Sequence, residues 1–445
     1  MPIDLGLARI SKLLKHLNNP HINAFKSIHI AGTNGKGSTI AYLSSILTQS
    51  RIPNGRFTSP HMLYYNDCIS INNEIYPWDK FKKVNDFILE QNSLLQLGCT
   101  EFELLTVTAF KIFELEKIDI AIIEVGLGGR LDATNVLEPY SETSKGGVIA
   151  SGITKIGFDH ENLLGHTLSA IAFEKAGIIK AGIPCVVDRS NNKEVIQVIQ
   201  EKAQQQSSDI YLVDGINESS PPPTLSDFKL STAKEVLKSS PLRGDYQLQN
   251  LSISLKIIEL LTITNHINLT LEQIKEGIKH TSWPGRLQQI TIPTLNNLSI
   301  LLDGAHNESA AIELGKFLDI ERHNNNNNNN NNNSGIIFII AMTSGKNIKS
   351  ILSHIVDKEK DTIIVTAFSQ PDQMPWIQSY DIKYLQHEAS LYVNDVDPLI
   401  ETNISNVLKH VATNYRHKND TRPIVLCGSL YLCGDVLRYI EAATS

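Results

Sequence analysis

The stretch SIHIAGTNGKGS, residues 27–38, joins an apolar segment to a glycine-rich loop and the start of a helix. Residues 27–30 are predicted as a short buried strand, and residues 38–48 repeat apolar side chains at the spacing of one helix face. Glycines let backbone N–H groups turn inward around an anion, and a helix N-terminus adds the positive end of its dipole. The order strand, loop, helix therefore predicts a phosphate-binding loop in an α/β protein.

The loop departs from the usual phosphate-loop pattern G-x-x-x-x-G-K-[ST] at two positions. Ile30 stands where the first glycine is expected, and Gly37 separates Lys36 from Ser38. Lys36 can still reach terminal phosphates, and the Ser38 hydroxyl can bind a magnesium ion. A chance glycine-rich turn is the alternative, but the flanking strand and helix favour the phosphate loop.

Strand-like apolar runs alternate with helical patterns along most of the chain. We expect an α/β fold with a mostly parallel sheet covered by helices on both faces. The predicted strands of the first part lie at residues 119–123, 148–156 and 183–187, with a helix at 167–180. The second part has predicted strands at residues 298–302, 336–341, 362–365 and 423–427, and helices at 309–318 and 430–442.

The segment 288–297, with turn residues and little periodicity, is the predicted domain boundary. We expect a large N-terminal domain at residues 1–290 and a smaller C-terminal domain at residues 298–445. Ligand sites of such proteins often lie in the cleft between domains. The asparagine tract at residues 324–333 and the segment SSPPPT at 219–224 are predicted as surface loops, because neither has apolar side chains to bury.

The composition excludes several classes of protein. The 445 residues are 41% hydrophobic, which is enough for a core, and the net charge of −7 gives no case for a nucleic-acid or membrane-surface binder. No apolar run reaches the roughly 18 residues that a membrane helix needs. The five cysteines form no C-x-x-C pair, so we expect buried thiols in a reducing compartment.

Two further groups fall at predicted strand ends, where ligands gather in an open α/β sheet. Glu124 ends an apolar strand, and its carboxylate can hold magnesium that bridges nucleotide phosphates. The alternative is a capping or salt-bridged acid. Asp159 and His160 follow another strand, where His160 is either a ligand or a structural histidine.

Lys175, in a predicted helix, has by itself the character of an ordinary surface lysine. Arg286 lies beside the predicted boundary, where it can clamp a phosphate when domains close or form a structural salt bridge. Asp303 and His306 follow the first strand of the second part. Together these groups predict a magnesium-dependent nucleotide enzyme and do not name its acceptor substrate.

Several motifs occur in one order: GTNGKGS, TSPH at residues 58–61, EVGLGGRLDATN at 124–135, DH at 159–160, EKAGI at 174–178, WPGR at 283–286 and DGAHN at 303–307. In this order they resemble the folylpolyglutamate synthases and dihydrofolate synthases, a family that belongs with the Mur ligases. The likeness extends from about Ile3 to Leu437 and is greatest to the fungal dihydrofolate synthases. It implies a P-loop-type ATPase domain followed by a Rossmann-like α/β domain.

The resemblance also implies a reaction. ATP would phosphorylate the carboxylate of 7,8-dihydropteroate, and the amine of L-glutamate would attack the acyl phosphate to give 7,8-dihydrofolate, ADP and phosphate. Polyglutamate extension of tetrahydrofolate is the alternative within the family. Two features favour the addition of a single glutamate. Many polyglutamating relatives have Glu-Arg where this chain has Asp67-Cys68, and many have an extra segment before IDLGL that is absent here. A nucleotide-binding regulator without chemistry is the alternative outside the family.

Site residues follow from the resemblance by position. Lys36, Glu124, His160 and Lys175 would be catalytic. ATP would be bound by Asn34, Gly35, Lys36, Gly37, Ser38, Asn250, Arg286 and Asp303, with His306 as a further contact. Magnesium, in two ions, would be bound by Ser59, Glu124, His160 and Lys175, the last as a carbamate. The pteroate-binding site would be lined by Thr100, Glu101, Phe102, Glu103, Leu131, Asp132 and Ala133.

The expected partners are the small molecules dihydropteroate, L-glutamate and ATP, with neither nucleic acid nor membrane. A monomer in the cytoplasm is expected. The N-terminus MPIDLGLARISKLLKHL has no secretory signal pattern, and a minor mitochondrial pool is left open.

Overall fold

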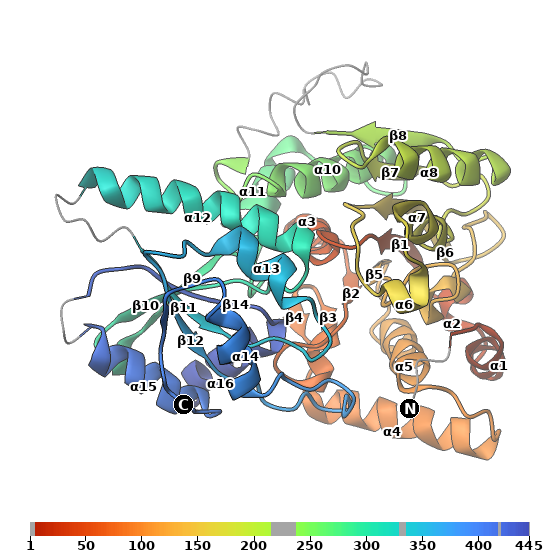
Figure 1. The fold of residues 1–445 in the computed structure, drawn as a ribbon. Helices are drawn as coiled ribbons and strands as arrows, with labels where there is room; N and C mark the ends of the chain where they lie inside the picture. Colours follow the sequence, from red (N-terminus) through yellow and green to blue (C-terminus); the bar gives the residue numbers. More distant parts are fainter. Residues whose placement is uncertain (1–4, 215–236, 329–334, 417–419, 445) are drawn as a thin grey trace. The chain divides into compact units, whose positions relative to one another are not determined.

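The computed structural model describes residues 5–214, 237–328, 335–416 and 420–444, and the chain divides into two compact units (Figure 1). The first unit comprises residues 1–61, 66–241 and 245–283, and the second comprises residues 62–65, 242–244 and 284–445. The segment SSPPPT at 219–224 lies outside the described residues.

The first unit is built on an eight-stranded sheet in the order β4-β3-β2-β5-β1-β6-β7-β8. Strands β2, β5, β1, β6, β7 and β8 run parallel, and β3 and β4 are antiparallel additions at one edge. The strands are β1 (Lys26–Ala31), β2 (Asn54–Phe57), β3 (Ile69–Ile71), β4 (Glu74–Ile75), β5 (Ile120–Glu124), β6 (Gly147–Ile153), β7 (Cys185–Asp188) and β8 (Ile210–Val213).

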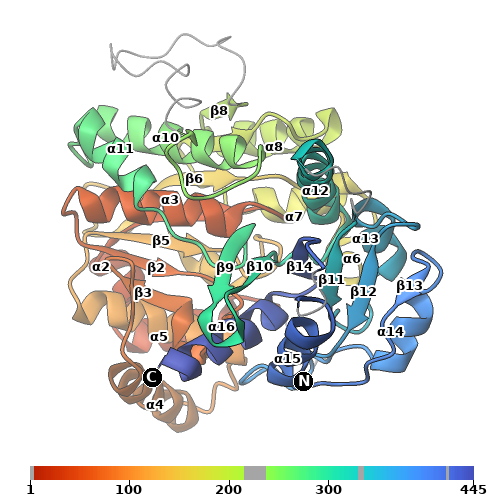
Figure 2. The ribbon, with the colours of Figure 1, turned by 90° about the vertical axis from the view of Figure 1, so that its left-hand side faces the viewer.

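Helices cover both faces of this sheet (Figure 2). Helix α3 (Lys36–Gln49) packs with α10 (Gln247–Ile263) and α11 (Leu271–Lys279) on one face. Helix α5 (Glu101–Leu115) lies on the other and packs with α1, α2 and α4. The other helices among the described residues of this unit are α1 (Ala8–His16), α2 (Pro20–Asn23), α4 (Trp78–Leu94), α6 (Glu161–Leu164), α7 (Leu168–Ala176), α8 (Lys193–Gln205) and the 3-10 helices η1 (Tyr65–Cys68) and η2 (Ala133–Val136).

The second unit has a six-stranded sheet in the order β13-β12-β11-β14-β10-β9, in which only β9 is antiparallel to its neighbour. The elements in the described part of this unit are β9 (Gln288–Ile292), η3 (Pro293–Leu295), β10 (Leu298–Leu302), α12 (Glu308–Asn328), β11 (Ile337–Ile340), α13 (Ile348–Ile355), β12 (Thr362–Val365), α14 (Ile382–Ala389), β13 (Asp395–Val396), α15 (Ile404–Asn414), β14 (Ile424–Cys427) and α16 (Leu430–Thr444). The prediction of a mostly parallel α/β architecture is confirmed.

Sequence boundaries were wrong at three places. The segment 288–297 forms β9 and η3 within the second sheet, so the change of unit falls earlier, between Trp283 and Pro284. Helix α7 ends at Ala176 rather than residue 180, because the next residue, Gly177, is the C-cap and glycine is a poor helix former. Helix α12 continues through His323 to Asn328, into the predicted asparagine loop.

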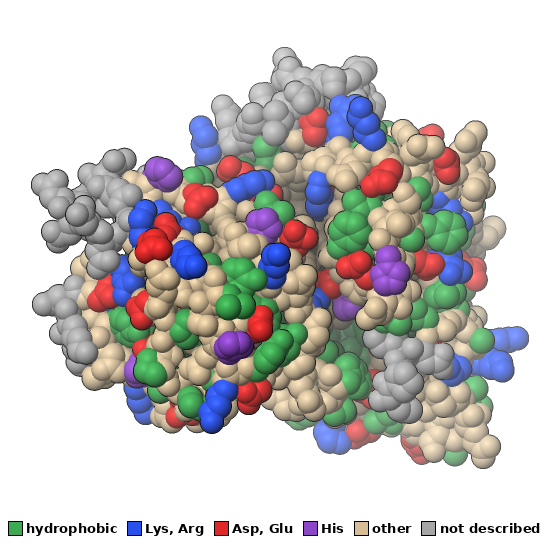
Figure 3. Space-filling model, in the orientation of Figure 1, with side chains coloured by type: hydrophobic (Ala, Val, Ile, Leu, Met, Phe, Trp, Pro, Cys, Tyr) green, Lys and Arg blue, Asp and Glu red, His purple; other side chains and the backbone are tan. Residues whose placement is uncertain are grey.

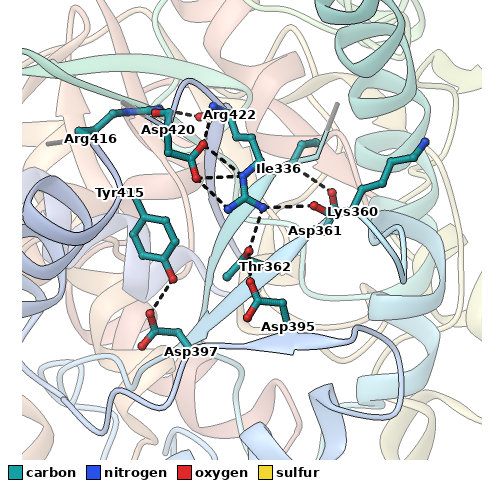
Figure 4. Close-up of polar contacts among 10 residues, drawn as sticks. All are labelled: Ile336, Lys360, Asp361, Thr362, Asp395, Asp397, Tyr415, Arg416, Asp420 and Arg422. Atoms are coloured by element: carbon teal, nitrogen blue, oxygen red, sulfur yellow. Dashed lines mark hydrogen bonds and ion pairs between the residues drawn. The ribbon is translucent and has the colours of Figure 1, made fainter. Parts of the chain in front are cut away.

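A polar network ties together the beginnings of parallel strands in the second unit (Figure 4). The Arg422 guanidinium donates to Asp420 Oδ1 at 3.2 Å, to Asp420 Oδ2 at 2.8 Å and to Thr362 Oγ1 at 2.9 Å. Asp361 accepts from the Ile336 N–H at 2.7 Å, just before β11. Because each charge here has partners from the chain itself, the network joins β11, β12 and β14 without a ligand.

The surface charges, the cysteines and the helices can be compared with the composition of the chain. On the face drawn in Figure 3, basic and acidic side chains are interspersed over the described residues. All five cysteines are buried free thiols, as predicted. Within the described ranges, no helix combines the length and apolar character required to cross a bilayer.

Candidate active site

The phosphate-binding loop predicted from the sequence lies at the carboxyl edge of the first sheet. It leaves β1 after Ala31, and Gly35 is the residue before helix α3, with a φ of 94° that favours glycine. The first residues of a helix lack intrahelical acceptors, so the N–H groups at the start of α3 can donate to an anion. The Asn34 N–H, in contrast, already donates to the Lys155 carbonyl at 3.1 Å.

Asn250, predicted to bind ATP, lies against this loop. A Cβ at Gly35 would be 2.2 Å from Asn250 Oδ1, so only glycine fits beside it. Asn250 Nδ2 donates to Gln247 Oε1 at 3.0 Å, and Gln247 Nε2 donates to Ser38 Oγ at 3.3 Å. The structure therefore brings Gly35, Ser38 and Asn250 together, and Gln247 joins them although no sequence signal singled it out.

Lys36 and Glu124 meet at the same edge. Lys36 Nζ lies 3.5 Å from Glu124 Oε1 and donates to the Thr33 carbonyl at 3.3 Å. The Ser59 N–H donates to Glu124 Oε2 at 3.3 Å. The ends of the parallel strands β1, β2 and β5 bring these three residues together, as expected for a doubly wound sheet.

A divalent cation fits the donor set at Glu124. Mg²⁺ prefers oxygen ligands and is commonly held by one or two carboxylates together with substrate phosphates. The Glu124 carboxylate and the Ser59 hydroxyl are oxygen donors on adjoining residues, beside the start of α3. Among the described residues, no group of three or more His, Cys, Asp or Glu side chains gathers to form a metal site by itself. The chain would thus supply part of the coordination shell and leave the rest to phosphate oxygens and water.

Lys175 is buried in this region, which excludes the alternative of an ordinary surface lysine. Its side chain in α7 is 6% exposed, and Nζ donates to the Gly32 carbonyl at 2.8 Å. Burial and, second, the charge of Lys36 lower the pKa of Lys175 to about 7. The charge of Lys36 thus disfavours a charge on Lys175 beside the same loop, and a bound anion or a carbamate on Lys175 would relieve that repulsion.

His160 follows β6 on the same side of the sheet. It has a φ of 52°, its side chain is half-exposed, and Nε2 lies 3.9 Å from Asp159 Oδ1. The prediction that His160 and Glu124 bind the same metal ion stays a prediction.

The two segments predicted to line a pteroate site meet at Phe102. Its ring stacks on Phe57, with centroids 5.9 Å apart, and a Cβ at Gly126 would lie 2.4 Å from Phe102 Cζ. Residues 100–103 are therefore next to the loop at residues 126–134. Glycine is needed at position 126 because a side chain there would collide with the Phe102 ring.

Some of the predicted pteroate residues have structural partners in the chain. Thr100 and Glu103 form a capping box at the start of α5, with Glu103 Oε2 accepting from the Thr100 N–H at 2.7 Å and from Arg9 Nε at 3.0 Å. Asp132 is 1% exposed and accepts from the Leu127 N–H at 2.8 Å. Glu101, Leu131 and Ala133 lie in the same two segments, and Ala133 is 6% exposed.

Arg56 and Trp283 lie beside the phosphate-binding loop, and the sequence analysis assigned a site role to neither of them. The Arg56 guanidinium lies over the Trp283 ring at 5.0 Å, and a Cβ at Gly37 would be 2.5 Å from the Trp283 ring. Burial lowers the pKa of Arg56 to about 10, so it remains charged at neutral pH. Trp283 belongs to the WPGR motif, whereas nothing local marks Arg56, because its environment comes from distant segments.

The second unit holds the other predicted nucleotide contacts. Asp303 follows β10, and its two oxygens accept from the Leu287 N–H at 3.0 Å and the Ala305 N–H at 2.9 Å. Arg286 lies against Gly304, where a Cβ would be 2.5 Å from Nη1. Burial raises the pKa of Asp303, and the charge of Arg286 opposes that shift. His306 Nδ1 lies 2.7 Å from the Gly304 carbonyl.

The fold and this loop define a P-loop-type, Mur-ligase-like α/β protein. A family model described as "Dihydrofolate synthetase, C-terminal domain" matches residues 287–439. The dihydrofolate synthetase of Saccharomyces cerevisiae is 39% identical over 98% of both chains, and a probable dihydrofolate synthetase of Schizosaccharomyces pombe is 38% identical over 99% of both. A crystal structure of folylpolyglutamate synthase from Thermotoga maritima is 27% identical, with a TM-score of 0.74 over 99% of this chain and 94% of that one.

The chain therefore belongs to the dihydrofolate synthetase and folylpolyglutamate synthase family, as its motifs predicted.

Proposed function

We propose that this protein is an ATP-dependent ligase that joins L-glutamate to 7,8-dihydropteroate. The observation that carries the proposal is the similarity over nearly the whole chain to fungal proteins named dihydrofolate synthetase. The placement of Lys36 and Glu124 at the start of α3 supports the ATP-dependent step.

The reaction needs an activated carboxylate. A carboxylate is a poor electrophile until one oxygen becomes part of a phosphate leaving group. The acceptor carboxylate attacks the terminal phosphorus of ATP, giving an acyl phosphate and ADP. The amine of glutamate then attacks the acyl carbon, a proton leaves the nitrogen, and inorganic phosphate departs as the amide forms.

Residues of the first unit would supply the electrostatics. Lys36 and the N–H groups at the start of α3 would neutralise charge on the transferred phosphoryl group. Asn250 and Ser38 would fix the loop that carries those donors. Magnesium, held by Glu124 and Ser59 with phosphate oxygens, would polarise the phosphoryl group. From the second unit, Arg286, Asp303 and His306 are proposed ATP contacts.

Lys175 is proposed to act as a carbamate. Its ammonium group would lose one proton, and the resulting amine would add to carbon dioxide with loss of a second proton, so that a buried cation becomes an anion. A carbamate oxygen suits a second magnesium ion, with His160 as a further ligand. The burial of Lys175 beside the phosphate loop supports this role.

The acceptor would lie where residues 100–103 meet the loop at 126–134. Phe102 offers a flat apolar face beside Gly126, which suits an aromatic ring system. Leu131 and Ala133 would add to the lining, whereas Thr100, Glu103 and Asp132 would act mainly by holding the two segments. Phe102 is thus the expected principal contact of the pterin.

The test is a mass-resolved assay of the purified chain with ATP and Mg²⁺. ADP should form only when both dihydropteroate and L-glutamate are present, and the product should carry one added glutamate. ADP formation that is indifferent to both substrates would refute the proposal.

The alternative within the family is extension of tetrahydrofolate by several glutamates, in line with relatives named folylpolyglutamate synthase. The same assay with tetrahydrofolate separates the two activities by product mass. Monomeric state and cytoplasmic location stay predictions from the sequence.

A further inference from the structure

A line of hydrogen bonds runs from the centre of the first sheet to the loop at residues 126–134. His29, in β1, has Nε2 2.9 Å from Thr134 Oγ1, and Thr134 Oγ1 lies 2.5 Å from Asp132 Oδ1. The exposed fractions of the three residues are 0%, 0% and 1%. Thr134 and Asp132 lie far from His29 in the sequence, so this line of hydrogen bonds exists only in the folded chain.

The chemistry of the groups fixes the direction of each hydrogen bond. The backbone N–H groups of Thr134 and Leu127 donate to the two oxygens of Asp132, at 3.0 and 2.8 Å, which is the arrangement of an ionised carboxylate although burial raises its pKa. An ionised carboxylate only accepts, so the Thr134 hydroxyl donates to it. That hydroxyl has one proton, and His29 Nε2 must therefore donate to Thr134.

His29 is thereby assigned a single tautomer. A neutral imidazole carries one N–H, so Nδ1 is the bare nitrogen, and among the described residues it has no hydrogen-bond partner. Burial and, second, the charge of Lys180 hold the pKa of His29 well below 6.5. With Asp132 ionised, a neutral His29 with Nε2–H satisfies the line, and it leaves the unpartnered Nδ1 without a buried N–H.

The next residue of the loop is anchored as well. Lys180 Nζ donates to the Asn135 carbonyl at 3.1 Å and to Asn135 Oδ1 at 2.9 Å, and Asn135 Nδ2 donates to the Gly177 carbonyl at 3.1 Å. Gly126, at the other end of the loop, packs against Phe102. The backbone that faces the proposed acceptor site is therefore held at Asp132, Thr134 and Asn135.

We propose that His29 and Thr134 are positioning residues that set the shape of the acceptor-binding loop through Asp132. The proposal rests on the proposed function, because it takes the loop at 126–134 to bind the acceptor. Loss of the Thr134 hydroxyl would leave both Asp132 Oδ1 and His29 short of a partner. The phosphate loop has ties of its own, such as Thr33 Oγ1 to the Gly157 carbonyl at 3.0 Å, so ATP binding should change much less.

The matched variants Thr134→Val and Thr134→Ser test this in the full chain. Valine keeps the shape of threonine and removes the hydroxyl, whereas serine keeps the hydroxyl. We expect Thr134→Val to raise the KM for dihydropteroate by roughly tenfold and to change the KM for ATP by less than about twofold. Thr134→Ser should stay close to the wild type. Equal KM values for the two variants, or equal increases for both substrates, would overturn the proposal.

His29 provides a second pair of variants. The amide of His29→Gln can donate near the position of Nε2, whereas His29→Leu cannot donate. His29→Leu should reproduce the Thr134→Val effect and add little to it in the double variant, because both changes break one line. Full additivity of the two effects on KM would contradict the proposed line of hydrogen bonds. Thermal unfolding of each variant shows whether a change in KM instead comes from loss of folding.

A spectroscopic measurement makes failure of this proposal distinguishable from failure of the proposed function. Nitrogen-15 NMR of labelled protein, with the His29 signals assigned by comparison with His29→Gln, should show Nε2–H and a bare Nδ1 at neutral pH. An Nδ1–H tautomer would overturn the line of hydrogen bonds whatever the enzyme acts on. Wild-type protein that forms no ADP with dihydropteroate and glutamate would instead refute the proposed acceptor.

Discussion

Two charged clusters of this protein differ in how their charges are satisfied. At the carboxyl edge of the first sheet, Lys36 and Lys175 lie beside one loop. Each donates to a backbone carbonyl, and Lys36 also lies 3.5 Å from the carboxylate of Glu124. At the amino edge of the second sheet, Arg422 is surrounded by acceptors from Asp420, Thr362 and Lys360 (Figure 4). Charges with partners from the chain stabilise the fold, whereas neighbouring cations with few acceptors are suited to a bound anion.

Lys36→Met should give the largest functional effect. Removing the cation at the start of α3 should lower kcat/KM for ADP formation by about 10²- to 10³-fold, because charge on the phosphoryl group loses its stabilisation. Thermal unfolding should change little, since Lys36 also repels Lys175. The control Lys83→Met changes an exposed lysine of α4 and should keep full activity. A Lys36→Met protein that unfolds instead would break the comparison.

Lys175→Ala should lose roughly 10²-fold in turnover, if a carbamate on this residue supplies a metal ligand. Formate or acetate should restore part of the activity, since a small carboxylate can occupy the space of the carbamate. Lys193→Ala, on the exposed side of α8, is the matched control. Full activity of Lys175→Ala would refute the role assigned to this position.

Arg422→Met should show the opposite behaviour to Lys36→Met. It leaves Asp420 without its ion pair in a poorly exposed position, which should destabilise the second unit by about 2–4 kcal/mol. At temperatures well below unfolding, kcat/KM should stay within about twofold of the wild type. Thermal unfolding and the ADP assay, with exposed Lys409→Met as control, measure both quantities. Unchanged stability would show that the network of Figure 4 does not hold the strands together.

Asp397→Asn should reveal a pH-dependent part of the second unit's stability. Burial alone would raise the pKa of Asp397, but hydrogen bonds from Tyr415 at 2.6 Å and His410 at 2.8 Å outweigh it and lower the pKa. A lowered folded-state pKa contributes stability above the ordinary aspartate value of about 3.9, and that contribution is lost as pH falls through the folded-state pKa.

At pH 7 the Asp397→Asn protein should therefore be about 1–2 kcal/mol less stable than the wild type, and the difference should vanish in strong acid. Thermal unfolding at a series of pH values measures it, with exposed Asp372→Asn as control. A difference that does not depend on pH would mean that the charge of Asp397 contributes nothing.

Deletion of residues 324–333 should have the smallest effect. Arg322, which reaches Asp361 and the Ile355 carbonyl from α12, precedes the tract, so the contacts that hold this helix on the second unit are kept. The deletion removes the last residues of α12 and shortens the connection to β11, and a change in connection length of this size alters the chain entropy little. We expect kcat within about twofold of the wild type, and a large decrease would show that the tract serves the site.

The sequence predicted the elements better than their ends. The strand before the phosphate loop and helix α3 were found from their apolar residues, because both elements are almost entirely buried. Strand β9 was predicted as part of the domain boundary, because its residues form no continuous apolar run. Its pairing with β10, which the sequence does not reveal, makes it a strand. Helix α12 extends past its apolar pattern to Asn328, which no hydrophobic periodicity could indicate.

Local motifs by themselves determined the phosphate-binding loop, the acid Glu124 at a strand end and the family. They could do so because glycine conformations, strand ends and helix starts are properties of short segments. Only the tertiary structure decided that Lys175 is buried, that Arg56 lies over Trp283, and that His29 reaches Asp132 through Thr134. Burial and side-chain contacts between distant segments depend on how the strands are ordered in the sheet, and no short stretch of sequence carries that order.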